Sequence, residues 1–449
     1  MTSVAATLAR FVGETQATDL PPLALERAKM VIASTLASAA AGLDIASTRV
    51  IREIAVERGG VPDASIWFAA LPHLPADQAA RANAVASDAA ASDDSDLRNI
   101  AHIGTIVTAT SLAIGQRTHA SGLDVLAALA LGYEVAGRIG GAITPGYSER
   151  GFHGCVITVF GGAVAAAKLL RLPPAGIASA VALAATSIGG LYAAANTSVA
   201  REYHAGLSAM LGIEAALAAA RGFAVDETIL EAPRGFFDTF GAGDRASVTE
   251  GLGKAWEITS HLAIKLVPGA HPYHAAAEAA AEVARQADVA PDDIDTVLVA
   301  ARSLGRHLVF HPTDLVGMAH SVPYFVAAGL VDRSFGWEHA APEKILDPVI
   351  SSVQDRVRID PDAERNAAVG RTCGGRVTLT TRSGGTYSST VQAPRGSSER
   401  GIEWSDVDAK YRAVLSSAQV SSSVVETSLE LVHHLDQLDD IAGLLPQPI

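Results

Sequence analysis

Cysteine is nearly absent from the chain, because Cys155 and Cys373 are the only two among 449 residues. Two cysteines cannot build a disulfide framework, so we expect a reducing compartment and predict a cytoplasmic location. Aromatic residues are also scarce, at 5%, although 49% of the residues are hydrophobic. The core must therefore consist mainly of Ala, Val, Leu and Ile, which suits closely packed helices.

Basic residues are outnumbered, with 34 Lys and Arg against 48 Asp and Glu and a net charge of −14. Nucleic-acid affinity depends on cationic contacts to phosphate, so we expect no nucleic-acid partner. An anionic small substrate remains possible, because a site can be locally basic. Apolar stretches such as "LDVLAALALGYEVAG" are short for a bilayer and carry charges, and the N-terminus lacks a basic segment leading into an apolar one. We therefore expect neither a membrane partner nor a signal peptide.

Familiar catalytic motifs are missing as well. The sequence contains no Gly-rich phosphate loop between a strand and a helix, no H-E-x-x-H, no paired C-x-x-C and no G-x-S-x-G. Any chemistry must therefore come from polar residues scattered among apolar segments.

Hydrophobic periodicity predicts helices almost throughout residues 1–255, most of them ending near glycine. After residue 260, "IDTVLVAAR" and "GGRVTLTTRSGGTYSSTVQA" alternate like strands, the second with a hairpin turn at Ser-Gly-Gly. Helical patterns return after Ser405, which is a candidate N-cap. We predict a mostly α protein, with a large all-α helical domain (1–264), an inserted smaller α+β lid domain (265–397), and C-terminal helices (398–449) returning to the first domain. A groove between two such domains is a common ligand site.

Two segments place polar residues at the start of predicted helices in the first half of the chain. "SDDSDLRNIAHIGT" contains Asp93 and Asp94 and then His102, just before a helix. The positive end of a helix dipole favours a neutral imidazole, which a general base requires, although an acidic loop can also be merely solvated or capping. "RGFHGCVITVFGG" presents His153 between two glycines, with Tyr147 shortly before it as a substrate-binding candidate. Taken alone, His153 is more simply explained as a structural hydrogen-bonding residue.

Two further segments follow the same pattern. "AREYHAGLSAML" brings Arg201, Tyr203 and His204 together before a long apolar helix. The guanidinium can hold a substrate carboxylate through two parallel hydrogen bonds, or form a structural pair with Glu202 or another carboxylate. "IKLVPGAHPYHAAAEAA" contains Lys265 and His274. A metal site on His271 and His274 would need a third ligand that the pattern does not supply, so we predict no metal.

These four segments, in this order, resemble the MmgE/PrpD family, which includes 2-methylcitrate dehydratase, cis-aconitate decarboxylase and iminodisuccinate epimerase. "RGFHGC" is similar to the family's G-(F/W)-H-x-T segment, "AREYHAG" lies where members have T-K-P-x-H-x-G, and "WEITSHLAIKLVPGAHPYH" resembles W-x-I … K-x-Y-P-x-C-x-x-x-H. The lid stretch "SVPYFVAAGL" also resembles a family segment. The resemblance covers essentially the whole chain and implies a homodimer of two-domain subunits that needs no cofactor.

The resemblance also implies site residues, and the chain departs from several of them. The family's histidines correspond to His102, His153, His204 and His274, and its motif lysine to Lys265. The departures are Arg201 for a lysine, Glu202 for a proline, Asp88 for a histidine, Ala91 for an aspartate, Cys155 for a threonine and Ala270 for a cysteine. Of the acidic loop, Asp93 and Asp94 are retained.

The known activities of the family share the removal of a proton beside a carboxylate, which requires a base and cationic stabilisation of the charge that develops. The resemblance implies that His102 or His274 is the base, and that Arg201, Lys265 and His153 stabilise the anion. We predict a cofactor-independent lyase of the dehydratase type acting on a small di- or tricarboxylic acid. The alternatives are an epimerase of an imino- or amino-dicarboxylate, a decarboxylase of the cis-aconitate type, and a carboxylate-binding protein without catalysis.

Overall fold

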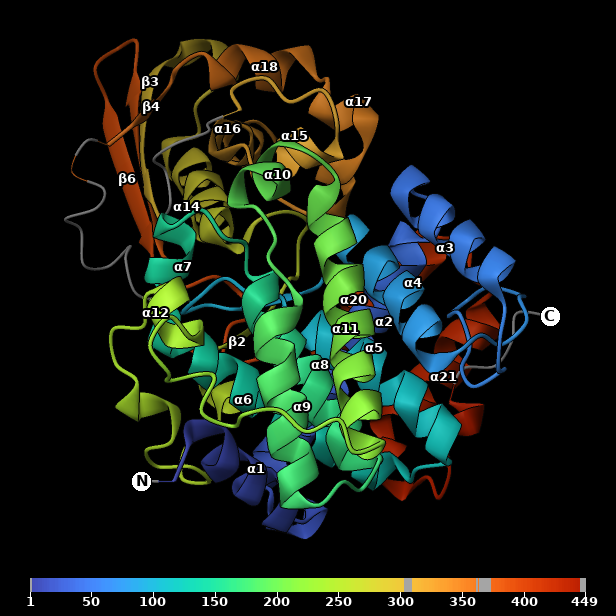
Figure 1. Ribbon diagram of the computed structural model, residues 1–449. Coiled ribbons are helices and arrows are strands. Elements are labelled where there is room, and N and C mark those ends of the chain that lie inside the picture. Colours follow the sequence, from blue (N-terminus) through green and yellow to red (C-terminus); the bar gives the residue numbers. More distant parts are fainter. Residues whose placement is uncertain (1, 303–308, 361, 363–372, 445–449) are drawn as a thin grey trace. The chain divides into compact units, whose positions relative to one another are not determined.

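The computed structural model describes residues 2–302, 309–360, 362 and 373–444 (Figure 1). It divides into a helical unit, Met1–Ala195, Val199–Leu262 and Trp404–Ile449, and a second unit, Asn196–Ser198 and Ala263–Glu403. Each unit is described by itself. The elements are mostly helices with few strands, which confirms the predicted mostly α fold class. The predicted ranges 1–264, 265–397 and 398–449, and the role of the second unit as a lid, stay predictions.

The helical unit is built almost entirely from helices, with one three-residue strand in the acidic loop. Its elements are α1 (Val4–Glu14), α2 (Pro22–Gly42), α3 (Ala46–Arg58), α4 (Ala76–Ala89), β1 (Asp94–Asp96), α5 (Ile103–Thr118), α6 (Gly122–Ile143), α7 (Gly146–Glu149), α8 (Cys155–Leu169), α9 (Pro174–Ser187), α11 (Ala200–Ala220), α12 (Phe236–Phe240), α13 (Glu257–Ser260), α20 (Trp404–Ser417) and α21 (Ser422–His433). Two short elements, α10 (Tyr192–Thr197) and β2 (Leu262–Ile264), begin in this unit and end in the other.

The core of the helical unit forms around α8, which packs against α5, α6 and α11. Glycines allow this close approach. A Cβ atom on Gly132 of α6 would lie 2.6 Å from the carbonyl oxygen of Gly161, and one on Gly212 of α11 would lie 2.8 Å from the main-chain nitrogen of Ala163. Any larger residue would push the helices apart. The abundance of small residues thus explains how α8 is surrounded by helices on several sides.

Helix α6 corrects one expectation from the sequence. It has 22 residues and is apolar enough to cross a membrane by length and composition, as is the bent pair α2 and α3 if counted together. The argument that this stretch is too short was therefore wrong. However, 94% of its apolar window is buried inside the protein, as in a core helix. Its buried charged residues Glu134 and Arg138 pair with each other, with 2.5 Å between Oε1 and Nε.

The C-terminal helices lie beside the N-terminal ones, as the red and blue ribbons of Figure 1 show, and α20 packs on α2. Buried Lys410 of α20 donates from Nζ to Ser34 Oγ at 2.7 Å and to the carbonyl of Ser92. This contact fixes the start of the acidic loop from the far end of the chain. Helix α20 begins at Trp404, so Ser405 lies within its first turn and the predicted N-cap was wrong.

The second unit combines helices with a four-stranded sheet. Its elements are α14 (His271–Ala287), β3 (Ile294–Ala301), α15 (Leu315–Ala319), α16 (Val322–Asp332), α17 (Pro342–Ile345), α18 (Pro348–Gln354), β4 (Val357–Ile359), β5 (Gly375–Thr381) and β6 (Thr386–Val391). The strand order is β4-β3-β5-β6, with β3 and β4 parallel and the other pairs antiparallel.

The predicted hairpin is present as β5 and β6, whose residues Leu379 and Tyr387 are partners across the turn. Residues of β5 alternate between buried and more exposed, because successive side chains point to opposite faces of a sheet. Helix α14 packs on α16 and on the sheet, and their apolar faces form one buried cluster with Val297, Val377 and Leu379. The second unit therefore has its own hydrophobic core.

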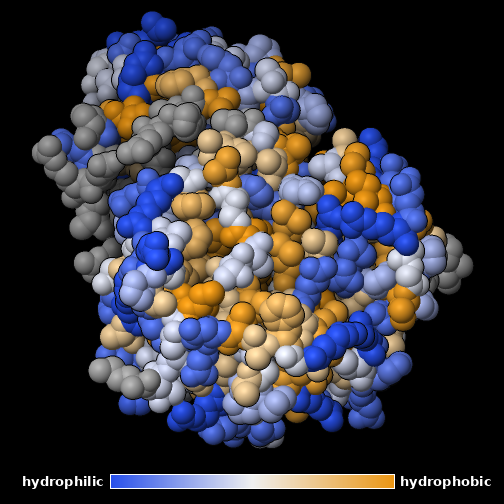
Figure 2. Space-filling model, in the orientation of Figure 1, coloured by the Kyte–Doolittle hydropathy of each residue, from blue (hydrophilic) through white to orange (hydrophobic). Residues whose placement is uncertain are grey.

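The surface is not uniformly polar. Figure 2 shows that apolar side chains gather on the face of the helical unit along which α9 and α11 lie in Figure 1. This agrees with the Ala-rich sequences of both helices. Exposed apolar surface of this kind often marks an association face.

Candidate active site

The acidic loop between α4 and α5 folds back onto the first turn of α5. Asp94 caps this helix, because its carboxylate accepts from the main-chain nitrogens of Gly104 at 2.9 Å and Thr105 at 3.1 Å. Asp93 accepts instead from the Thr105 hydroxyl, at 2.9 Å. Both carboxylates are fully buried. Asp94 therefore has a structural task at the positive end of the helix, as an anion at that position should.

His102 is the N-cap residue of α5, and its ring is held in one orientation. Its Nδ1 lies 2.8 Å from Asp93 Oδ2 and 2.8 Å from the main-chain oxygen of Asp94. A carbonyl oxygen can only accept a hydrogen bond, so Nδ1 must carry a proton. In the neutral ring the basic nitrogen is then Nε2. A carboxylate behind an imidazole fixes its tautomer and stabilises the imidazolium that forms when the ring takes up a proton.

Arg201 forms a buried ion pair with Asp88, which was not among the predicted site residues. Its Nε lies 2.7 Å from Asp88 Oδ2, and a second nitrogen donates to the Asp88 carbonyl at 2.6 Å. Glu202, the partner considered first, accepts from Ser47 instead. Burial disfavours the cationic form of Arg201, but the charges of Asp88 and Asp93 outweigh it and raise its pKa. Arg201 therefore carries a positive charge, and the carboxylate of Asp88 balances most of it.

His153 and His204 face each other, with 3.3 Å between their Nδ1 atoms. His153 precedes α8 and donates its main-chain N–H to the Gly190 carbonyl at 2.9 Å, while His204 lies in the first turns of α11. Burial lowers the pKa of His204, and the charge of Asp88 opposes this only in part. A neutral ring is the expected form, so one imidazole donates and the other accepts.

Cys155 completes this pair of imidazoles. Its sulfur and one ring nitrogen from each of His153 and His204 all lie within 4.8 Å of one another. Burial raises the pKa of the Cys155 thiol to about 12, although main-chain N–H groups, first that of Gly190, oppose the shift. Gly190 lies against the cluster, and a Cβ atom there would come within 2.5 Å of the sulfur and 2.8 Å of the His204 ring. Cys155 and Gly190 were not predicted as site residues.

The helical unit therefore brings five of the predicted site residues into one region. Ligand atoms of Asp88, Asp93 and His102 lie within 4.8 Å of one another, and Asp88 also pairs with Arg201 and influences His204. The five predicted residues are Asp93, His102, His153, Arg201 and His204. Asp88, which the sequence showed only as a departure from the family pattern, joins the two parts of the region.

The two predicted substrate-binding tyrosines are placed differently. Tyr147 is buried and donates from its hydroxyl to the Asn99 carbonyl at 2.5 Å. Tyr203 is exposed, and the guanidinium of Arg81 lies 5.6 Å from the centre of its ring. Consecutive residues of a helix point about 100° apart, which explains why Tyr203 faces away while His204 faces His153. Neither tyrosine shows a contact that assigns it to substrate.

Lys265 and His274 belong to the second unit, and both are buried. His274 lies in the first turn of α14, with Nε2 3.2 Å from the Gly269 carbonyl and its ring stacked on Phe325. His271 begins the same helix, and its ring centre is 4.8 Å from that of His274. In the described part of the chain, no third cysteine, histidine or carboxylate completes a metal-ligand set with these two histidines.

A separate cluster of buried charge lies where α6 meets α13. Arg98 donates to the Gly137 carbonyl at 2.7 Å and pairs with Glu257, whose main-chain nitrogen donates to Glu134 at 2.7 Å. Burial raises the pKa of Glu257 to about 8, although the charge of Arg98 opposes the shift. These side chains form hydrogen bonds and ion pairs with other parts of the helical unit, so we interpret this cluster as structural.

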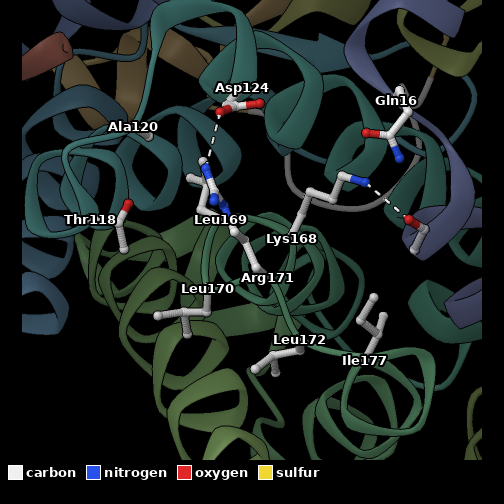
Figure 3. Close-up of a pocket in the computed structure, with 11 residues that line it drawn as sticks. Gln16, Thr118, Ala120, Asp124, Lys168, Leu169, Leu170, Arg171, Leu172 and Ile177 are labelled. Carbon is white, nitrogen blue, oxygen red and sulfur yellow. Dashed lines mark hydrogen bonds and ion pairs between the residues drawn. The ribbon is translucent and has the colours of Figure 1, made fainter. Parts of the chain in front are cut away.

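A pocket of about 720 Å³ lies elsewhere in the helical unit (Figure 3). Its lining includes Lys168 and Arg171, which would suit an anion, but both cations are engaged. Lys168 donates to the carbonyls of Val12 at 2.8 Å and Thr15 at 2.7 Å at the end of α1. Arg171 lies 3.9 Å from Asp124, and Figure 3 shows the two side chains pointing toward each other. None of the predicted site residues lines this pocket, so we do not assign the active site to it.

Comparison with known proteins identifies the class of protein that carries this arrangement. Residues 6–249 match the MmgE/PrpD N-terminal domain, and residues 268–437 match the MmgE/PrpD C-terminal domain. The chain therefore belongs to the MmgE/PrpD family, as the sequence segments predicted.

Similar proteins include enzymes named cis-aconitate decarboxylase. The human enzyme is 25% identical over 94% of this chain and 89% of its own length. That of Aspergillus terreus is 26% identical over 98% of this chain and 95% of its own length. The cis-aconitate decarboxylase-like protein oryM of Aspergillus oryzae is 27% identical over 72% of this chain and 71% of its own length.

Proposed function

We propose that the protein is a lyase that removes a proton beside a carboxylate of a small di- or tricarboxylic acid, with His102 as the base. The observation that carries this proposal is the pair of acceptors behind the His102 ring, Asp93 Oδ2 and the Asp94 carbonyl, each 2.8 Å from Nδ1. They leave Nε2 as the nitrogen that can accept a proton. Partial burial of the ring limits its exchange of protons with water.

The second requirement is stabilisation of the negative charge that develops on the substrate. The proton beside a carboxylate is very weakly acidic, so a base alone is insufficient. Arg201 was predicted to hold the carboxylate, but Asp88 neutralises much of its charge. His153 and His204 offer further hydrogen-bond donors in the helical unit. Lys265 and His274 remain proposed site residues through the family resemblance.

We place dehydration first among the possible reactions. Proton removal by His102 would be followed by loss of a hydroxyl group as water from the adjacent carbon, after an acid protonates that hydroxyl. Decarboxylation is the second candidate, and the relatives named cis-aconitate decarboxylase, two of which align over nearly the whole chain, favour it. Their identity of 25–26% supports the family more than the substrate. Epimerisation would return the proton on the opposite face.

The decisive experiment is proton NMR of the purified protein in D₂O with a panel of hydroxy-tricarboxylates, cis-aconitate and amino-dicarboxylates. We expect loss of the signal of a proton beside a carboxylate, followed by an olefinic signal. Loss of CO₂ from cis-aconitate would establish decarboxylation instead, and formation of a stereoisomer alone would establish epimerisation. Binding of these acids without exchange or turnover would overturn the enzymatic proposal and identify a carboxylate-binding protein.

We also propose that the protein is a cytoplasmic homodimer that needs no cofactor. The apolar face along α9 and α11 in Figure 2 supports association, and size-exclusion chromatography with light scattering would test it. A monomer at micromolar concentration would contradict this proposal.

A further inference from the structure

We propose that His153, Cys155 and His204 form a binding site for Zn²⁺, and that the ion inhibits the protein rather than serving its reaction. The three residues belong to the same unit, with His153 just before α8, Cys155 at its first position and His204 in the first turns of α11. Zinc binding follows from their geometry alone, whereas inhibition rests on the proposed function.

The distances fit a tetrahedral ion. With a Zn–N distance of about 2.0–2.1 Å, two imidazole ligands at the tetrahedral angle have nitrogens roughly 3.3 Å apart. The two Nδ1 atoms of His153 and His204 are 3.3 Å apart before any ion is bound. The Cys155 sulfur lies within 4.8 Å of the ligand nitrogens, so a small side-chain rotation brings it into a common coordination sphere. A water molecule or a substrate carboxylate can take the fourth position.

The donor atoms select a borderline-soft ion. Two imidazoles and a thiolate are typical zinc ligands, whereas Mg²⁺ and Ca²⁺ require oxygen ligands. The structure contains a second group with suitable spacing, formed by Asp88, Asp93 and His102. There the carboxylates already pair with Arg201 and His102 and accept from Thr105. A cation would compete with Arg201 at that group, and no such charge lies among the three residues proposed here.

The surroundings leave room for the ion and account for the protons. Gly190 presents no side chain to the cluster, and both imidazoles are partly exposed. On binding, the Cys155 thiol releases its proton to solvent, and the imidazole proton shared between the two Nδ1 atoms moves to an Nε2 atom. Burial holds the thiol protonated in the absence of metal, and a coordinating metal ion reverses this preference. We therefore expect release of about one proton per ion bound.

Bound zinc would occupy the Nδ1 atoms of His153 and His204, so neither Nδ1 could donate to the substrate anion and only the Nε2–H groups would remain. It would leave His102 and Asp93 unchanged, because their contacts lie in the other group. The inhibition should accordingly be reversed by a chelator, and the protein should be most active after chelator treatment.

The test combines equilibrium dialysis with Zn²⁺ and optical spectroscopy with Co²⁺ on the full-length protein. We expect one ion per chain and an intense near-ultraviolet thiolate-to-cobalt band. Cys155→Ser should remove the band and weaken Zn²⁺ binding more than about 100-fold, since it removes a direct ligand. Cys373→Ser is the matched control, because it removes the other buried cysteine, and it should bind both ions like the natural protein. Circular dichroism verifies that each variant is folded, and His204→Gln provides a second variant that lacks a ligand.

Each outcome bears on one of the two proposals. Equal Zn²⁺ binding by the natural protein and Cys155→Ser, a cobalt complex without the thiolate band, or no binding at all would overturn the metal site. Zinc binding at this site without inhibition would keep the site and overturn the proposed inhibition. Turnover that zinc inhibits in the natural protein, and in Cys155→Ser only at far higher concentration, would support both proposals.

Discussion

Two histidine sites in the helical unit differ in what stands behind the imidazole. His102 has a buried carboxylate and a carbonyl at its Nδ1 atom, whereas His153 and His204 face each other through their Nδ1 atoms, with a thiol beside them. The first arrangement fixes one tautomer and leaves Nε2 as the nitrogen without a proton in the neutral ring. In the second, burial lowers the pKa of His204 and the pair shares a proton. The same side chain thus acquires a basic role in one place and a donor or ligand role in the other.

The most direct test of this difference is to remove the imidazole of His102. We expect His102→Gln to lower kcat for proton removal by about 10²–10⁴-fold, the range typical of a general base. The measurement is exchange of the substrate proton with D₂O, followed by NMR. His119→Gln is the matched control, because His119 ends the same helix with an exposed side chain and should be dispensable. Unchanged exchange in His102→Gln would show that the base lies elsewhere.

A smaller effect is expected from changing the partner of His102 instead of the ring. Asp93→Asn offers an amide that can donate to Nδ1 and favour the wrong tautomer, so we expect kcat to fall about 10–10³-fold with little change in KM. Asp94→Ala is the comparison, because it removes a helix cap and should cost about 1 kcal/mol of stability while retaining most of kcat. Equal losses of kcat in both variants would assign Asp93 a merely structural role.

The ion pair of Asp88 and Arg201 lies between the two histidine sites, and its loss should affect stability. Asp88→Asn leaves the buried Arg201 charge without its partner, so we expect a loss of about 3 kcal/mol in the free energy of unfolding. The freed guanidinium should also bind carboxylates better, and KM should fall. Urea titration measures the first effect and steady-state kinetics the second. Glu202→Gln, which changes a buried carboxylate bonded to Ser47, should leave KM unchanged.

The smallest expected effect is on stability, and it concerns the buried cluster of Arg98, Glu134 and Glu257, to which we assign a structural role. Burial raises the pKa of Glu257 to about 8, so the folded protein keeps a proton that the unfolded chain, with its ordinary pKa of 4.5, releases. Stability should therefore fall as pH rises from 4.5 toward 8. Thermal unfolding of Glu257→Gln should show a weaker fall than the natural protein. Glu426→Gln, an exposed carboxylate paired with Arg412, should retain the full pH dependence.

Much of the fold could be predicted from local pattern. Helical periodicity ending in glycine predicted the helices of the first unit, and the alternation around Ser-Gly-Gly predicted β5 and β6. The expectation that such apolar stretches are too short for a bilayer and interrupted by charge was wrong for α6, whose buried charged residues are Glu134 and Arg138. In the folded chain they form a pair one helical turn apart and are buried with the rest. A pairing of this kind follows from the helix and is invisible to a hydropathy argument.

The residue types of the candidate site could be predicted from the sequence, but the contacts between those residues could not. The sequence by itself determined the family, the mostly α class and the presence of imidazoles and an arginine at helix starts, because these depend on local spacing and ordered motifs. Only the tertiary structure decided that Arg201 pairs with Asp88 rather than Glu202, and that His204 faces His153 with Cys155 beside them. These contacts join residues from α4, α8 and α11 that are far apart in the chain. Close packing of glycine-containing helices sets which side chains meet, and neighbouring positions in the sequence do not contain that information.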